Sequence, residues 1–163
     1  MTSEWTLCRW AAAGIALALA LAWTPSDAQA KPLSRQLQTV LQHGPAGAEV
    51  IGPNRVQWPR QGVTVLLNKR KASWEDCIGK WVCLFEDAHG RGRMIIFAKP
   101  GKFRLKAWSM GPDPAHHRGV SSYYKRRLGR ALLWGPNYRH NVSPGKHNLP
   151  RDINDRSSYL QLF

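Results

Sequence analysis

The chain of 163 residues carries 24 Lys or Arg side chains against 10 Asp or Glu, a formal net charge of +14. Its length supports one domain with its own core but hardly two. The charge favours polyanionic partners such as nucleic acid, anionic lipid, wall polymers or an acidic protein, although solubility alone explains it equally well. The motifs H-E-x-x-H, G-x-S-x-G and the P-loop are missing from the sequence, so we expect a binding protein rather than an enzyme.

Residues 1–30 are expected to form a signal peptide. Ala11–Trp23 is an apolar run of 13 residues, short for a membrane span, and Ala28-Gln29-Ala30 offers a cleavage site before Lys31. An N-terminal membrane anchor is the alternative. Cleavage would remove one Arg, one Glu and one Asp, leaving 23 cationic and 8 acidic side chains and a formal charge of +15. We therefore expect a secreted protein.

Two cysteines, Cys77 and Cys83, remain after cleavage at Ala30. An even number of cysteines in an exported chain predicts one disulfide, and two buried free thiols are the alternative. The ring that this disulfide closes is short, so it should stabilise the fold by roughly 2 kcal/mol.

Residues 31–48 are expected to form a leader segment that contains a short helix. Ser34 can cap the helix at its N-terminus, and Gly44-Pro45 can end it. Apolar residues recur near one face at helical spacing, at Leu33, Leu37, Val40 and Leu41. A flexible pro-segment is the alternative.

Residues 49–163 are expected to form one β domain that begins with two hairpins. The runs V-Q-W and V-T-V-L-L flank the turn P-R-Q-G and predict the first hairpin. The stretch 74–97 follows as W-E-D-C-I-G-K-W-V-C-L-F-E-D-A-H-G-R-G-R-M-I-I-F. Trp81–Phe85 and Met94–Phe97 are predicted as its two strands, around a polar turn that contains glycine.

From this stretch onward the chain nearly repeats itself. Leu84-Phe85 is matched by Leu133-Trp134, and the string P-G-K-x-x-L occurs at both 100 and 144. Ser121-Ser122-Tyr123 is matched by Ser157-Ser158-Tyr159. The order of the strings is kept while the loops differ in length, which predicts two related units at about 74–127 and 128–163. Two such antiparallel units packed face to face would form an all-β Greek-key sandwich.

The stretch C-I-G-K-W-V-C-L-F-E-D-A-H-G-R-G-R resembles the opening of the βγ-crystallin-like secreted proteins classed with a bacterial peptidase-inhibitor family, of metalloproteinase-inhibitor type. The upstream I-G-P-N-R-V-Q-W-P-R-Q-G-V-T-V-L-L and the terminal N-L-P-R-D-I-N-D-R-S-S-Y resemble the strand pair and the closing segment of that family. The resemblance covers about Ile51–Phe163. It implies a βγ-crystallin-like Greek-key sandwich preceded by a short helix and a β-hairpin.

The resemblance assigns structural roles to five residues of the two hairpins. A crystallin-type hairpin requires an aromatic residue, a glycine where a Cβ would be blocked, and a later serine whose hydroxyl pins the hairpin. The matching residues are Phe85, Gly92 and Ser122 in the first unit and Trp134 and Ser158 in the second. The second unit has no glycine at the position that the hairpin motif requires, so we expect its hairpin to be degenerate.

Many such domains bind Ca²⁺ through two adjacent Asn/Asp residues, two spacers, Ser/Thr and Ser, because this cation requires several oxygen ligands. Aligned on Ser157-Ser158, the adjacent pair is Ile153-Asn154, and the corresponding pair in the first unit is His117-Arg118. We expect no strong calcium site in the first unit and at most a weak one near Asn154 and Ser157 in the second. No other cofactor is expected.

The resemblance implies a non-covalent inhibitor of an extracellular protease that acts through an exposed loop. We expect the protein to be a monomer. We expect the contact surface at the turn 86–93, E-D-A-H-G-R-G-R, or in the loop 110–119, M-G-P-D-P-A-H-H-R-G. After the expected disulfide, no cysteine is left between residues 31 and 163 to brace such a loop further.

The alternative is a cationic antimicrobial or toxin-like protein, or a module that binds anionic surfaces and polymers without specificity for nucleic acid. The positive charge motivates this alternative, together with a basic patch at Lys125, Arg126, Arg127 and Arg130. Such binding should weaken steeply as the salt concentration rises.

Overall fold

The structure is a computed structural model that describes residues 33–67, 73–77, 81–111, 119–126 and 129–163. The signal peptide expected at 1–30 lies outside these residues, as do Arg127 and most of the loop 110–119. The described residues belong to one compact unit, Pro32–Phe163. In the part of the chain that is described, no helix is long and apolar enough to cross a membrane.

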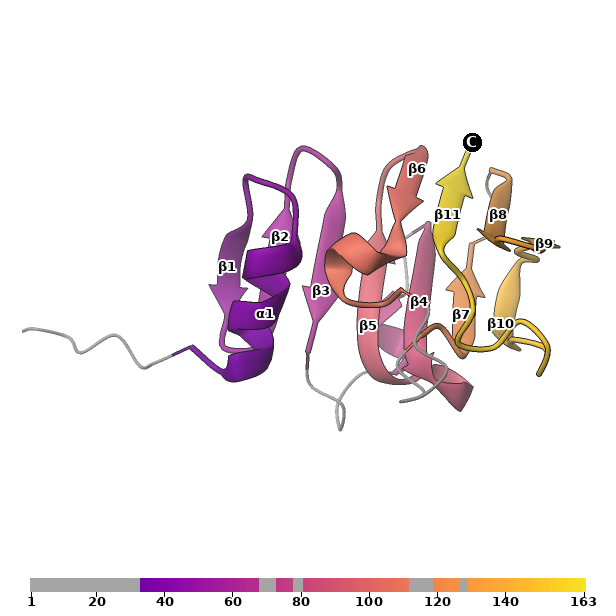
Figure 1. Cartoon of the computed structure of the whole chain (residues 1–163), viewed down its shortest axis with the longest axis horizontal. Coiled ribbons are helices and arrows are strands. Elements are labelled where there is room, and N and C mark those ends of the chain that lie inside the picture. The colour runs from indigo at the N-terminus through magenta and orange to yellow at the C-terminus, as the bar shows by residue number, and fades with distance from the viewer. Residues whose placement is uncertain (1–32, 68–72, 78–80, 112–118, 127–128) are drawn as a thin grey trace, which may run out of the picture. The chain divides into compact units, whose positions relative to one another are not determined.

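Two antiparallel sheets make up most of this unit (Figure 1). Across the larger sheet the order is β1 (Glu49–Gly52), β2 (Arg55–Trp58), β3 (Val63–Leu66), β5 (Arg91–Phe97), β4 (Val82–Asp87), β7 (Ser122–Lys125) and β10 (Gly145–Asn148). Across the smaller sheet it is β6 (Gly101–Arg104), β11 (Tyr159–Leu162), β8 (Ala131–Gly135) and β9 (Tyr138–Asn141). The predicted mostly β, sandwich-like architecture is therefore confirmed.

Each sheet contains one strand from the other half of the chain. β6 belongs to the first predicted unit but pairs with β11 of the second, with Phe103 opposite Leu160. Conversely, β10 of the second unit pairs with β7 of the first, with His147 opposite Tyr123. Neither sheet is complete without both halves of the chain.

The main core lies between the two sheets and follows from the alternation of apolar residues along the strands. In β2 and β3 the core-facing side chains are at most 1 % exposed, namely Val56, Trp58, Val63 and Val65. The residues between them along each strand are partly or fully exposed. In β4 and β5 both faces are buried, because a second apolar cluster covers the outer face of the larger sheet.

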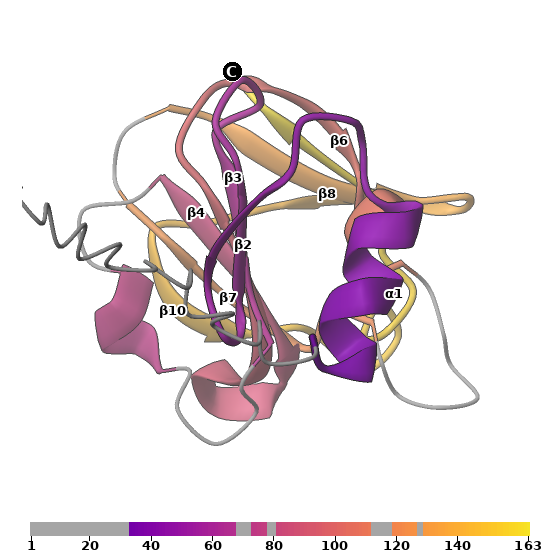
Figure 2. The same ribbon diagram turned by 90° about the vertical axis from the view of Figure 1, so that its left-hand side faces the viewer.

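The helix α1 (Arg35–His43) lies beside β1, β2 and β3, on the same side of the larger sheet as the smaller sheet (Figure 2). Ser34 caps its N-terminus by accepting a hydrogen bond from the Leu37 N–H at 3.3 Å. Leu37 and Val40 are buried in the same core as Trp58, whose indole N–H donates to the Pro45 carbonyl at 2.8 Å. The short helix that the sequence predicts is confirmed, and it packs in the core of the β domain.

A disulfide joins Cys77 and Cys83, whose Cα atoms lie 6.0 Å apart, as the sequence predicts. Cys77 ends the short helix η1 (Trp74–Cys77), and Cys83 lies on the outer face of β4. Both cysteines belong to the second apolar cluster, in which the Trp74 ring meets the ring of the fully buried Phe85 at a centroid distance of 4.8 Å. The disulfide therefore fastens η1 over the outer face of the larger sheet.

The turn between β4 and β5 is folded back onto the sheet through Ser122 of β7. The Ser122 hydroxyl donates to the Asp87 carbonyl at 2.6 Å and accepts from the Gly90 N–H at 3.0 Å. Gly90 has a φ of +72°, and a Cβ there would lie 2.5 Å from the Trp74 indole. Gly92 has a φ of +83°, in the left-handed region that favours glycine.

The second unit is related to the first by a register that differs by one residue from the serine match in the sequence. Phe85 lies opposite Ser122, and the equivalent Trp134 lies opposite Tyr159. Ser158, which the sequence match equates with Ser122, comes one residue earlier and donates its backbone N–H to the Trp134 carbonyl at 3.0 Å. Tyr159 therefore occupies the place of Ser122.

Replacement of Ser122 by Ala should destabilise the protein by about 1–3 kcal/mol, because the Gly90 N–H and the Asp87 carbonyl lose their partner. The matched control Ser158→Ala should change the free energy of unfolding by less than about 0.5 kcal/mol, because this side chain lines a surface pocket. Urea denaturation followed by tryptophan fluorescence measures both values. Equal losses in the two variants would contradict the register described above.

Candidate functional site

The outer face of the smaller sheet is cationic. Its four strands carry no Asp or Glu, and all of their residues lie in the described part of the chain. Three exposed cationic side chains stand on them, Lys102 and Arg104 on β6 and Arg139 on β9. No carboxylate on these strands offsets the three charges, and the Asp152 carboxylate that acts on Tyr138 of β9 is accompanied there by Arg156. The strands of this face therefore favour a positive potential.

One row of side chains across this sheet places two aromatic rings between two arginines. Arg104 pairs with Tyr159, Tyr159 with Trp134, and Trp134 with Arg139. Residues paired across neighbouring strands project from the same face of a sheet. Residues adjacent to them along the strands are buried in the core instead, namely Phe103, Leu133 and Leu160. All four side chains of the row therefore stand on the outer face.

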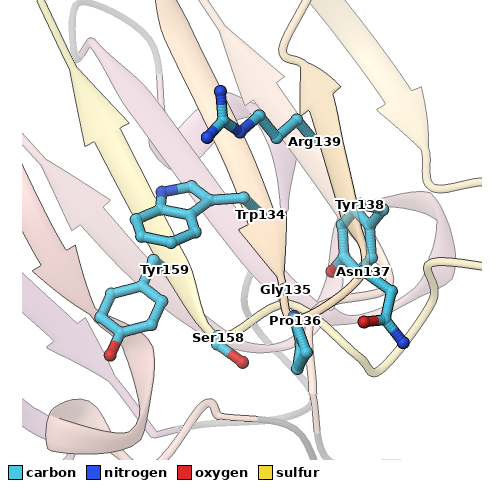
Figure 3. Close-up of a pocket in the computed structure, with 8 residues that line it drawn as sticks. All are labelled: Trp134, Gly135, Pro136, Asn137, Tyr138, Arg139, Ser158 and Tyr159. Atoms are coloured by element: carbon cyan, nitrogen blue, oxygen red, sulfur yellow. The ribbon is translucent and has the colours of Figure 1, made fainter.

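The rings of Trp134 and Tyr159 stack on each other, with centroids 4.5 Å apart and planes inclined by 20°. The Lys102 ammonium lies 4.7 Å from the Trp134 centroid and 5.5 Å from that of Tyr159. Both rings are partly exposed, and Figure 3 shows them next to each other, with Arg139 extending over the same surface. We call this set the aromatic–cationic face, defined as Lys102, Arg104, Trp134, Arg139 and Tyr159.

The aromatic pair borders an open pocket of about 560 Å³, lined by residues 134–139, Ser158 and Tyr159 (Figure 3). Glycine is required at 135, because a Cβ there would come within 2.6 Å of the Tyr138 ring. The Tyr138 hydroxyl donates to Ser157 Oγ at 2.7 Å, and burial raises the pKa of this phenol. The pocket thus combines an aromatic wall, one arginine and the neutral side chains of Asn137 and Ser158.

In the first unit the positions equivalent to Trp134 and Tyr159 are buried. Phe85, the counterpart of Trp134, is fully buried against Trp74, and Ser122, the counterpart of Tyr159, is bonded to the folded-back turn. In the second unit two residues, 136 and 137, join β8 directly to β9. The two positions that the first unit buries therefore carry partly exposed rings in the second.

The basic patch predicted at 125–130 does not form one exposed surface. Lys125 is only 4 % exposed, because the alternation along β7 directs it inward, and its Nζ donates to the Arg126 carbonyl at 3.0 Å. Burial lowers the pKa of the Lys125 ammonium. Arg126 and Arg130 are exposed, and the Arg130 guanidinium lies 5.6 Å from the ring centroid of Phe163. Arg127 lies outside the described residues.

The two calcium candidates, Asn154 and Ser157, do not act together. Ser157 is fully buried and its hydroxyl is bonded to the β9 tyrosine, whereas the Asn154 amide donates to Asp155 Oδ2 at 3.0 Å. The observed pairing of Trp134 with Tyr159, however, shifts the alignment of the calcium-binding pattern by one residue. With Ser158 at the Ser/Thr position, the adjacent pair becomes Asn154-Asp155, and both residues match the pattern. Only the final serine, replaced by Tyr159, departs from it.

Asn154 and Asp155 line a second pocket of about 400 Å³ together with Asp87 and Ser121. The Ser121 hydroxyl donates to Asp155 Oδ1 at 3.3 Å, and Asn154 Oδ1 is buried with no hydrogen-bond partner among the described residues. Carboxylate, amide and hydroxyl oxygens are the ligands that Ca²⁺ prefers. Arg151 lines the same pocket and opposes a cation. The residues therefore fit a weak calcium site that would cross-link the first hairpin to the 150–155 turn.

Comparison of the chain with models of protein families, with curated proteins and with solved structures finds no match. The function must therefore be inferred from the geometry of the chain itself. Within the described residues no three His, Cys, Asp or Glu side chains gather as a metal-binding group, and the pocket at Asn154 contains only two carboxylates, Asp87 and Asp155.

The sequence prediction did not include Lys102, Arg104 or Arg139 among the functional residues. A signal for them does exist, because cationic residues alternate with the buried Phe103 along β6 and Arg139 follows the aromatic Tyr138. That alternation places the cations beside the aromatic pair only because β6 pairs with β11 of the other half of the chain.

Calcium should stabilise the protein weakly. If the dissociation constant is roughly 1 mM, as in extracellular modules, about 10 mM CaCl₂ should add about 1.4 kcal/mol. The melting temperature should then rise by about 3–5 °C. The variant Asn154→Ala should abolish this rise, whereas Ser157→Ala should keep it. Differential scanning fluorimetry with MgCl₂ as the ionic control measures the effect, and an unchanged melting temperature in CaCl₂ would contradict the site.

Proposed function

We propose that the protein is an exported, βγ-crystallin-like binding module that holds polyanions on the aromatic–cationic face. The observation that carries this proposal is the smaller sheet itself, whose strands present Lys102, Arg104 and Arg139 without a single carboxylate. The larger sheet, in contrast, carries Glu49, Glu86 and Asp87 among its cations.

The crystallin-like part of the proposal is supported by topology. Two four-strand sets, β5-β4-β7-β10 and β6-β11-β8-β9, each combine three strands of one unit with one strand of the other. The backbone bonds of the two units also correspond, because Ser121 N–H donates to Phe85 O at 2.9 Å and Leu149 N–H donates to Ser121 O at 2.9 Å. In the second unit Leu105 N–H donates to Ser158 O at the same distance.

Binding on this face should depend steeply on salt. Each phosphate that a Lys or Arg neutralises contributes a slope of roughly −0.7 to −0.9 to the dependence of log K on log salt. The three cations of the face should therefore give a slope of about −2 to −3. Aromatic neighbours strengthen the site, because the rings exclude water from one side of the Lys102 ammonium.

The double variant Arg104→Gln/Arg139→Gln should bind fluorescently labelled polyphosphate about tenfold or more weakly, and its salt slope should become shallower by about 2. The matched control is Arg35→Gln/Arg55→Gln, which removes the same charge from two exposed positions on α1 and β2. This control should stay within about twofold of the wild type. Fluorescence anisotropy across a NaCl series measures both. Equal losses in the two double variants, or no binding at low salt, would refute the proposal.

A second candidate function is inhibition of an extracellular protease through the turn at Asp87–Gly90. The observation that favours it is the bracing of this turn without a further disulfide. His89 N–H donates to Asn148 Oδ1 at 2.7 Å, and the Asn148 amide lies 3.2 Å from His89 Nδ1. Ser122 holds the other side of the turn through its two hydrogen bonds. Such a turn loses little conformational entropy when it docks.

Purified protein titrated against a thermolysin-like and a subtilisin-like protease tests this second function. Inhibition should appear at micromolar protein and should be reduced at least tenfold by Ala88→Arg, which places a bulky charge on the exposed tip. The control Arg55→Gln should inhibit as the wild type does. Full protease activity at micromolar excess of the protein would exclude inhibition of these two classes.

A further inference from the structure

We propose that the polyanion held by the aromatic–cationic face is an acidic polysaccharide, with one sugar ring stacked on Trp134 and Tyr159 and its charged groups paired with Arg104 and Arg139. This inference rests on the proposed function and specifies its ligand. A purely electrostatic surface needs no aromatic groups, whereas this face carries a partly exposed aromatic pair at its centre.

The order of side chains in the row from Arg104 to Arg139 suits an acidic polysaccharide, in which sugar rings carry the charged groups. Neighbouring strands lie about 4.8 Å apart, so the Cα atoms of Arg104 and Arg139, at opposite ends of a four-strand row, are separated by roughly 14 Å. Trp134 and Tyr159 occupy the two strands between them. A ligand that crosses the row therefore meets a cation, then two ring faces, then a second cation.

Lys102 links the charged and the aromatic parts of the face. Its ammonium lies 4.7 Å from the Trp134 centroid, so an anionic group paired with it is held directly beside the rings. In an acidic polysaccharide the carboxylate or sulfate is attached to the ring itself. A ligand of this kind can pair with Lys102 and cover the aromatic surface with the same sugar residue.

Neutral polar side chains beside the rings favour a sugar over a nucleobase. Asn137 and Ser158 line the pocket, and Gln161 and Asn141 stand on the same face as the row, two residues along β11 and β9. Amide and hydroxyl groups both donate and accept, which suits the many hydroxyls of a sugar. The two rings lie 4.5 Å apart with no space for a third ring between them, so a ring of any ligand must stack on the outer surface of the pair.

The inference is tested with four polymers of matched length on the full folded protein. Polygalacturonate supplies carboxylates on sugar rings, poly-L-glutamate supplies carboxylates without rings, dextran supplies rings without charge, and oligo(dT) supplies charges with bases. Polygalacturonate should bind at least tenfold more tightly than poly-L-glutamate and should quench or shift tryptophan fluorescence. Dextran should bind at least tenfold more weakly than polygalacturonate.

The variant Trp134→Leu should lose the tenfold preference for polygalacturonate over poly-L-glutamate. Trp134→Phe, which retains a ring, should restore at least half of the preference on a logarithmic scale. Near-ultraviolet circular dichroism and the melting temperature verify that each variant is folded. A variant that does not fold is replaced by Tyr159→Thr, a β-branched residue at the neighbouring position of the same ring pair.

The outcomes separate this inference from the proposed function. If polygalacturonate and poly-L-glutamate bind equally and Trp134→Leu changes neither, the sugar inference is overturned while polyanion binding stands. If oligo(dT) alone gains from Trp134, the ligand is single-stranded nucleic acid and the sugar inference is again overturned. If none of the charged polymers binds at low salt, both proposals fail.

Discussion

Two hydrogen bonds of the Ser122 hydroxyl determine how the two halves of the chain differ. They hold the turn between β4 and β5 against the larger sheet, where Gly90 packs against Trp74. A buried N–H without a partner costs about 1–3 kcal/mol, so this turn depends on the serine. The second half has Tyr159 at the equivalent position. Its hairpin therefore stays open, and a pair of rings is left on the surface.

The two sheets also differ in how their charges are arranged. On the larger sheet the nearly buried Glu86 pairs with Arg93 at 3.0 Å, so cations and carboxylates offset each other locally. Within the strands of the smaller sheet no such pair can form, because they carry only cationic charges. The strands of the smaller sheet thus carry three cations and no carboxylate, beside the partly exposed aromatic pair. The proposed function assigns this combination of rings and cations to polyanion binding.

Features that depend on neighbouring residues could be predicted from the sequence. The Cys77–Cys83 disulfide, the helix capped by Ser34 and the β-rich runs all follow from local spacing, and the structure contains each of them. The register of the second unit could not be predicted, because Ser157 and Ser158 offer two matches that differ by one residue. The inward direction of Lys125 also depends on which face of β7 meets the core. Pairing between distant strands decides both questions.

The exchange of β6 and β10 makes the aromatic–cationic face depend on both halves of the chain. Arg104 comes from the first half of the chain and Arg139 from the second, and they share one sheet only while β6 remains paired with β11. A polymer that contacts both Arg104 and Arg139 would be bound to both halves of the chain at once and would link them. Since a ligand that binds only the native state stabilises it, a polymer bound along this row would oppose separation of the two halves of the chain.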